Sequence, residues 1–66
     1  MTNEWHDDTP LARQTLTDTQ FLTWFMHQRG CSHRTIAAYR HVSPSTVRDC
    51  LDACHRLIEK AKNEAA

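Results

Sequence analysis

The feature that most constrains this chain is a pair of helix-start signals separated by a short turn, within residues 32–51. Ser32 is a candidate N-cap for one helix, and Ser43 is a candidate N-cap for the next, with Pro44 at its first position. Serine oxygens accept hydrogen bonds from the free amides of a helix start, and proline at this position gives up an N–H that has no intrahelical partner. The apolar residues that would let two such helices cross closely are Ile36, Ala37, Val42, Val47 and Leu51. The stretch therefore predicts a helix-turn-helix unit, a motif typical of DNA binding.

The length and composition of the chain bound the rest of the fold. A chain of 66 residues has room for one domain, which buries only a modest fraction of its surface. No apolar run approaches the ~20 residues of a membrane span, and the N-terminus does not resemble a secretion signal. The three cysteines are an odd number, which argues against a disulfide framework. We therefore expect an intracellular, cytoplasmic protein that makes no membrane contact.

The formal net charge is zero, but the positive charge is concentrated on the expected motif. Between Arg13 and Arg48 the chain carries five arginines against one acidic residue, Asp18, whereas residues 1–8 carry three acidic residues. A local excess of positive charge matters more for phosphate contact than the sum over the chain. The sequence therefore predicts a basic motif with modest non-specific affinity for nucleic acid.

The domain organisation is expected to be a flexible N-terminal arm at residues 1–15, a folded unit at residues 16–62 and a tail at residues 63–66. Pro10 would interrupt any helix in the arm, so the arm is expected to be extended or disordered. Trp5 is the exception in this polar segment, and it could fold back onto the core or meet a partner.

Three helices are expected in the folded unit. The first follows Thr17, whose spacing from Gln20 is that of a capping box, and it ends at Gly30. The second covers about residues 33–40, and the third runs without a break from Pro44. The expected fold is thus a small all-α, trihelical domain with an extended C-terminal recognition helix.

The first and third helices carry more apolar surface than three short helices can bury. In the first helix, the surplus indicates either a dimer or packing by the N-terminal arm. In the third, the edge formed by Leu57, Ile58 and Ala61 is either a dimer seam or a cover for the first helix of the same chain. The apolar residues of the first helix are Phe21, Leu22, Trp24, Phe25 and Met26.

The residues quoted so far resemble the helix-turn-helix of sigma-factor region 4 and of LuxR-type response regulators. The resemblance covers about residues 16–60, and its most specific part is the string from Val42 to Val47, Val-Ser-Pro-Ser-Thr-Val. It implies sequence-specific binding of double-stranded DNA, with the second helix of the motif in the major groove.

Two positions depart from the pattern of these families. His41 stands where the families have glycine in the turn, and histidine tolerates a left-handed conformation better than most residues do. Arg40 stands where they have leucine. Either Arg40 snorkels while Tyr39 fills the gap, or the helix is rotated.

Arg48 is the expected base reader, because a guanidinium can bind guanine O6 and N7 together. Its alternative roles are a phosphate contact or a solvated charge. Thr46 could be a helix-start side chain without a ligand, and Asp49 could accept from cytosine N4 or lie above the groove. The start of the preceding helix is expected to contact phosphates. The DNA-binding candidates are Ser43, Ser45, Thr46, Arg48, Asp49 and Asp52 for the bases, and His33, Arg34 and Thr35 for the phosphates.

Neither metal binding nor catalysis is expected. The chain has no Cys-x2-Cys pair, and Cys50 and Cys54 fall on the apolar stripe of the third helix. The remaining candidate zinc ligands, Cys31, His33 and His55, complete no recognised ligand pattern. No paired carboxylates, nucleophile–base pair or glycine-rich loop is present, so we expect no enzyme, cofactor or small-molecule ligand.

Two functions are compatible with this sequence. The first is a small transcription regulator that binds double-stranded DNA as a homodimer and acts as a repressor by occupying an operator. The second is a protein-interaction module that binds RNA polymerase, a sigma factor or another regulator. The broad aromatic face of the first helix and the neutral net charge favour the second.

Overall fold

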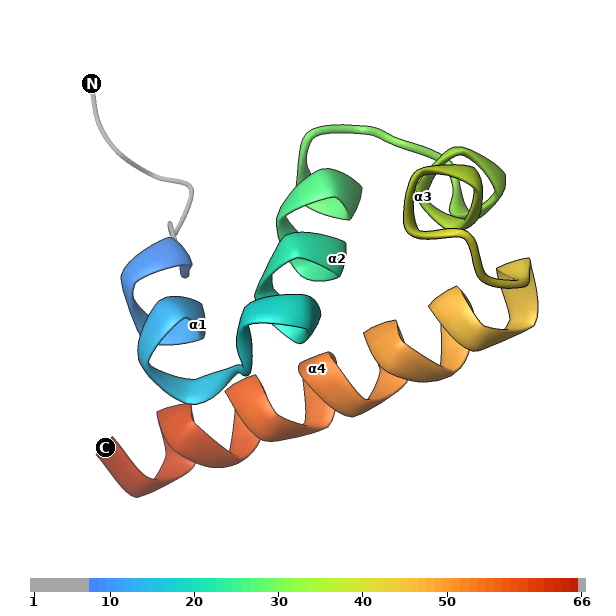
Figure 1. Ribbon diagram of the computed structural model, residues 1–66. Helices are drawn as coiled ribbons and strands as arrows, with labels where there is room; N and C mark the ends of the chain where they lie inside the picture. Colours follow the sequence, from blue (N-terminus) through green and yellow to red (C-terminus); the bar gives the residue numbers. More distant parts are fainter. Residues whose placement is uncertain (1–7, 66) are drawn as a thin grey trace.

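The computed structural model describes residues 8–65, which form four α-helices and their connections (Figure 1). The helices are α1 (Thr9–Thr15), α2 (Asp18–Gln28), α3 (His33–Arg40) and α4 (Pro44–Ala65). The three shorter helices lie along one side of α4, and each of them contacts it. The all-α class is therefore confirmed, but the described chain has four helices instead of the expected three.

Helix α1 corrects the expectation that residues 1–15 form an extended arm. Pro10 lies in its first turn, where a missing N–H breaks no intrahelical bond, so this proline is compatible with a helix that begins beside it. Ala12 is fully buried and Leu11 packs on the core. Residues 1–7, which include Trp5, lie outside the described residues.

The expected helix-start and helix-end signals of α2 are confirmed. The Thr17 hydroxyl accepts from the Gln20 amide at 3.2 Å, and the Gln20 side chain accepts from the Thr17 amide at 3.0 Å, which completes the capping box. Gly30 has a φ of 95°, and its N–H donates to the carbonyl of His27 while the N–H of Cys31 donates to that of Met26. This pair of bonds is a Schellman motif, which needs a left-handed residue at the position of Gly30.

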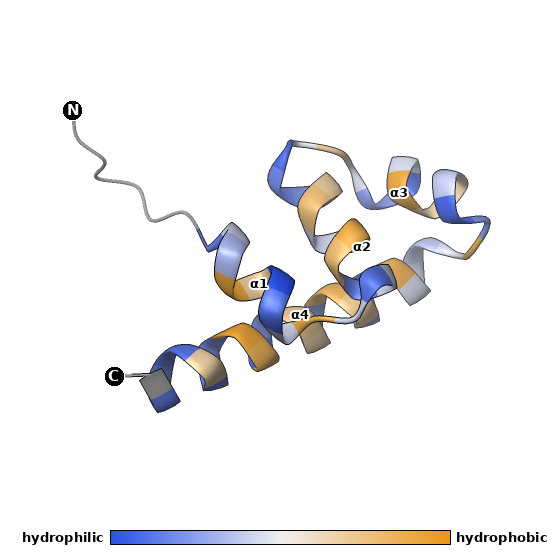
Figure 2. Ribbon diagram, turned by 60° about the vertical axis from the view of Figure 1, so that its left-hand side comes forward, coloured by the Kyte–Doolittle hydropathy of each residue, from blue (hydrophilic) through white to orange (hydrophobic). Residues whose placement is uncertain are grey.

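The core consists of two clusters that both use α4. Figure 2 shows apolar residues on α2 and α4 where these helices lie side by side. The cluster nearer the C-terminus joins α1, α2 and α4, and it covers part of the apolar surplus of α2. Its buried residues are Ala12, Leu16, Trp24, Cys54 and Ile58. The second cluster joins α3 to the first half of α4, and its buried residues are Ile36, Ala37, Val47 and Leu51.

The far edge of α4 is divided between the core and the surface. Ile58 is buried against α2 of the same chain. For this residue, the expectation that the edge covers a helix of its own chain is therefore confirmed. Leu57 is 37% exposed. In the described part of the chain, no helix combines the length and the apolar character that a membrane-spanning segment requires.

Candidate nucleic-acid interface

The connection between α3 and α4 is a tight turn at residues 41–43. His41 adopts the left-handed conformation with φ 60° and ψ 44°, as expected for a histidine in the glycine position. The N–H of Val42 then reaches back to the carbonyl of Ala37 at 3.0 Å, and the Val42 side chain packs against the second cluster. This turn fixes the start of α4 against α3.

Both helices that meet at this turn begin with a serine cap. The Ser32 hydroxyl accepts from the Thr35 amide at 3.1 Å, and the Ser43 hydroxyl accepts from the Thr46 amide at 3.1 Å. Each cap gives a hydrogen-bond acceptor to one of the free backbone N–H groups in the first turn of its helix. The N–H groups that remain free carry the partial positive charge that favours anions there. The two predicted N-caps are therefore confirmed.

A hollow of about 180 Å³ lies between the start of α3 and the start of α4, and four residues line it: His33, Pro44, Ser45 and Arg48. Three of these are predicted site residues. Ser45 and Arg48 come from consecutive turns of α4, and His33 is the first residue of α3. Crossing of the two helices thus places a guanidinium, an imidazole and a hydroxyl around one concave surface.

The other predicted site residues do not line this hollow. The hydroxyls of Ser43 and Thr46 lie 3.0 Å apart, and the Thr35 hydroxyl accepts from Ser32 at 3.0 Å. These three hydroxyls therefore take part in the helix starts, which is the role left open for Thr46. The remaining candidates, Arg34, Asp49 and Asp52, are exposed.

The charge of this face is mixed. Arg48 is followed on α4 by Asp49 and, one turn from Arg48, by Asp52. Arg34 supplies positive charge near the start of α3. The basic surface around the hollow is therefore small, and Asp49 and Asp52 limit how far along α4 a phosphate backbone can approach favourably.

Arg40 has a role that the sequence did not indicate. Its Nη1 atom donates to the hydroxyl of Thr23 at 2.9 Å, and Thr23, which is fully buried, donates in turn to the carbonyl of Thr19 at 3.0 Å. Tyr39 is 63% exposed, so the alternative in which it fills the place of the family's leucine is wrong. Arg40 instead ties α3 to α2 through a polar contact beside the core.

Three histidines from three helices form a row that the sequence pattern does not indicate either. The His27 ring centroid lies 5.5 Å from that of His33 and 6.4 Å from that of His55. The Nδ1 atom of His27 is buried and has no hydrogen-bond partner. His33 thus has the imidazole of a second histidine, His27, beside it. Residues this far apart in sequence give no periodic signal.

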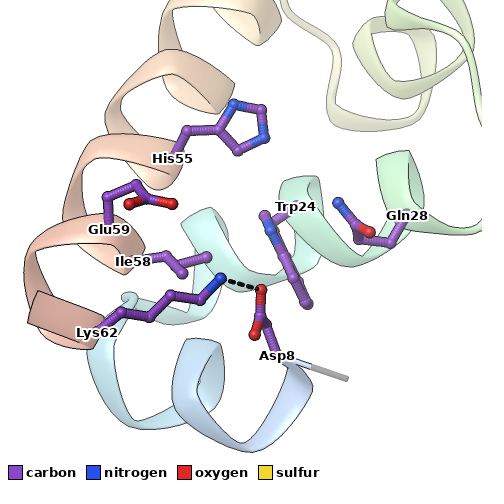
Figure 3. A pocket seen from close by; sticks show the side chains of 7 residues that line it. All are labelled: Asp8, Trp24, Gln28, His55, Ile58, Glu59 and Lys62. Carbon is purple, nitrogen blue, oxygen red and sulfur yellow. Dashed lines mark ion pairs between the residues drawn. The ribbon is translucent and has the colours of Figure 1, made fainter. Parts of the chain in front are cut away.

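A second hollow, of about 140 Å³, lies where α1, α2 and α4 meet (Figure 3). It contains the ion pair between Asp8 and Lys62, whose atoms are 3.0 Å apart, and hydrogen bonding to Asp8 raises the pKa of Lys62. Pockets for small organic ligands usually measure about 300–1,000 Å³, so this hollow is small for such a ligand. None of the predicted site residues lines it. Its lining residues are Asp8, Trp24, Gln28, His55, Ile58, Glu59 and Lys62.

The cysteines of α4 belong to the core. Cys54 is fully buried and lies 3.6 Å from the carbonyl oxygen of Gln20. Burial raises the pKa of its thiol from 9.0 to about 12, and the adjacent Cys50 thiol adds to the shift. Within residues 8–65, no group of three or more His, Cys, Asp or Glu side chains is arranged to hold a metal ion.

Comparison of the chain with protein-family models, with curated proteins and with solved structures found no match.

Proposed function

We propose that this chain is a sequence-specific, double-stranded-DNA-binding transcription regulator in which α3 and α4 act as a helix-turn-helix. In this proposal α4 is the recognition helix, the protein binds as a homodimer in the cytoplasm, and it represses by occupying an operator. The likeness of residues 36–47 to sigma-factor region 4 supports the motif. The chemistry of the hollow supports the ligand.

The observation that carries the proposal is the meeting of two capped helix starts around His33, Ser45 and Arg48. Helix starts attract phosphate, and a guanidinium beside them can grip either phosphate or the O6 and N7 edge of guanine. The hydroxyl of Ser45 adds a further hydrogen-bonding group. A concave, positively polarised surface of this size suits the edge of a DNA groove better than a free metabolite.

Selection of bound sites from a random pool of duplex DNA tests this proposal directly. We expect an enriched, palindromic sequence. Replacement of Arg48 by alanine should then weaken binding to that sequence by about 1–3 kcal/mol and relax the preference at one base pair. Arg56→Ala is the matched control, because Arg56 is an exposed arginine two turns further along the same helix. Equal losses for both variants, or none for Arg48→Ala, would contradict a recognition role for the start of α4.

A protein-interaction module that binds RNA polymerase, a sigma factor or another regulator is the second candidate. The half-buried Phe21 and Phe25 and the 38% exposed Leu22, which leave part of the apolar surface of α2 uncovered, favour it. The salt dependence of binding separates the two candidates. The logarithm of a DNA-binding constant falls with the logarithm of salt concentration, with a slope of about −0.9 per neutralised phosphate. A hydrophobic protein contact changes little over the same range.

A further inference from the structure

Two arginines and two phenylalanines form a continuous series of contacts from α1 along α2, where the half-buried phenylalanines also pack on the core. The Arg13 guanidinium lies over the Phe21 ring at 4.9 Å from its centroid, and that of Arg29 lies over the Phe25 ring at 5.7 Å. The two rings are stacked, with centroids 5.8 Å apart and planes 23° apart. We call these four residues the Arg–Phe ladder.

The ladder is open to a ligand. Arg13 and Arg29 are exposed, Phe21 and Phe25 are half-buried, and no ion pair of either arginine is found within residues 8–65. A guanidinium that stacks on a ring keeps its in-plane N–H groups available for carboxylates. The ladder therefore fits a segment that combines carboxylates with an aromatic side chain.

We propose that the Arg–Phe ladder is the docking surface for the chain's own N-terminal segment, residues 2–7. In this segment Glu4 precedes Trp5 directly and Asp7 follows it two residues later. The segment therefore carries both carboxylates and an aromatic side chain, the two kinds of group that the ladder fits. The rest of α1 and α2 offers little competition, because Asp18 is the only acidic residue in either helix. The inference does not depend on the proposed DNA-binding function.

The place where the segment begins favours an intramolecular contact. Helices α1 and α2 run in roughly opposite directions, so the start of α1 and the end of α2 point to the same side of the molecule (Figure 1). Asp8 and Gln28 line the same hollow, and Arg29 follows Gln28 directly. Trp5 precedes Asp8 by three residues, so it can lie up to about 10 Å from Asp8. The segment thus starts at the Arg29 end of the ladder and can reach it without any change in the helices.

Acrylamide quenching of tryptophan fluorescence in the full chain tests the docking. Trp24 is only 4% exposed, and a Trp5→Phe variant measures its signal so that it can be subtracted. We expect Trp5 to be quenched about threefold less than the same residue in a peptide of residues 1–8, because exposed cation–π contacts and ion pairs each favour the bound form by roughly two- to fivefold. Glu4→Lys with Asp7→Lys should abolish this protection, and so should Arg13→Glu with Arg29→Glu.

Controls separate this contact from the other possible occupants. Arg34→Glu with Arg56→Glu makes the same change in net charge elsewhere on the surface and should leave Trp5 protected. Combining both charge reversals, on the segment and on the ladder, should restore protection. Circular dichroism checks that each variant keeps its helical content. The two lysine substitutions, at positions 4 and 7, precede the first of the four helices. Peptide-like quenching of Trp5 in the wild-type chain would overturn the proposal. So would protection that survives Arg13→Glu with Arg29→Glu, or protection lost on dilution, which would assign the ladder to a second copy.

Discussion

The geometry of the α3–α4 turn depends on His41, which is a strained residue because it adopts the left-handed conformation. A residue with a Cβ atom pays about 1–2 kcal/mol in the left-handed region, partly offset because glycine loses more entropy on folding. We therefore expect His41→Gly to stabilise the fold by about 0.5–1 kcal/mol and to raise the melting temperature by a few degrees. His41→Val should destabilise it, because a β-branched side chain is poorly tolerated there. Thermal unfolding followed by circular dichroism measures both. A loss of stability in His41→Gly would show that the imidazole makes a contact that outweighs the strain.

Cys54 provides a test of the core at the level of one thiol. Its pKa is raised to about 12, chiefly by burial, so the thiolate that reacts with alkylating agents is suppressed. We expect the folded protein to be alkylated at Cys31 and Cys50 before Cys54, with all three equally reactive in denaturant. Mass spectrometry of the labelled peptides measures the order, and prior labelling of Cys54 would contradict this packing.

The same shift predicts how stability depends on pH. The folded state keeps its proton on Cys54 while the unfolded state loses it above pH 9.0, so unfolding becomes easier as the pH rises from there toward about 12. The slope for one group is at most about 1.4 kcal/mol per pH unit. A Cys54→Ala variant should lack this component, so the stability difference between it and the wild type should change across that range in urea titrations. A difference that is constant with pH would mean that the thiol is not shielded.

At the scale of elements, the contact between Arg40 and Thr23 is the polar link that sets α3 against α2. Thr23→Val keeps the volume of the side chain but leaves the Arg40 guanidinium without its acceptor, and we expect a loss of about 1.5–3 kcal/mol. Arg40→Leu removes the guanidinium and with it the need for an acceptor. In the double variant most of the loss should be recovered, because neither partner is then left unpaired. Urea unfolding of the two single variants and the double variant gives the coupling energy. Simple additivity of the two losses would show that the hydrogen bond does not stabilise the fold.

The elements also show why part of this fold could be predicted from the sequence and part could not. Thr17, Ser32 and Ser43 act through neighbours within three residues, so the starts of α2, α3 and α4 are confirmed as predicted. Helix α1 has no side-chain cap hydrogen bond and only seven residues, and its place depends on tertiary contacts such as the burial of Ala12. Its proline is ambiguous by itself, because the same residue breaks a helix interior and suits a helix start.

The candidate site divides in the same way. The identities of His33, Ser45 and Arg48 could be proposed from the motif, since they follow the two capped starts. Their meeting around one hollow depends on the crossing of α3 and α4. The row of His27, His33 and His55 depends on three helices at once. Contacts of this kind leave no local pattern in the sequence.

At the scale of the whole molecule, the dimensions bear on how much DNA one copy can contact. The longest extent is 35 Å and the radius of gyration is 12.5 Å. One turn of B-DNA measures about 34–36 Å, so in the proposed function a single copy spans at most about one turn and presents one helix start to one major groove. One such contact specifies few base pairs, whereas two half-sites multiply the specificity. The size therefore favours two copies side by side on one face of the duplex.

This geometry predicts the spacing of the operator and the assembly that binds it. The selected sites should be palindromes whose half-sites are centred about one turn apart, since major grooves on one face of the duplex recur once per turn. Inserting about half a turn, roughly five base pairs, should rotate the second half-site to the opposite face and lower the affinity to that of one half-site. Inserting a full turn should return the second half-site to the same face of the duplex, but it should leave the two protein copies too far apart to contact each other. Sedimentation of the complex with a palindromic duplex should give two protein chains per duplex. A single chain per duplex, with an affinity unchanged by either insertion, would leave α4 as a monomeric reader and remove the homodimer from the proposed function.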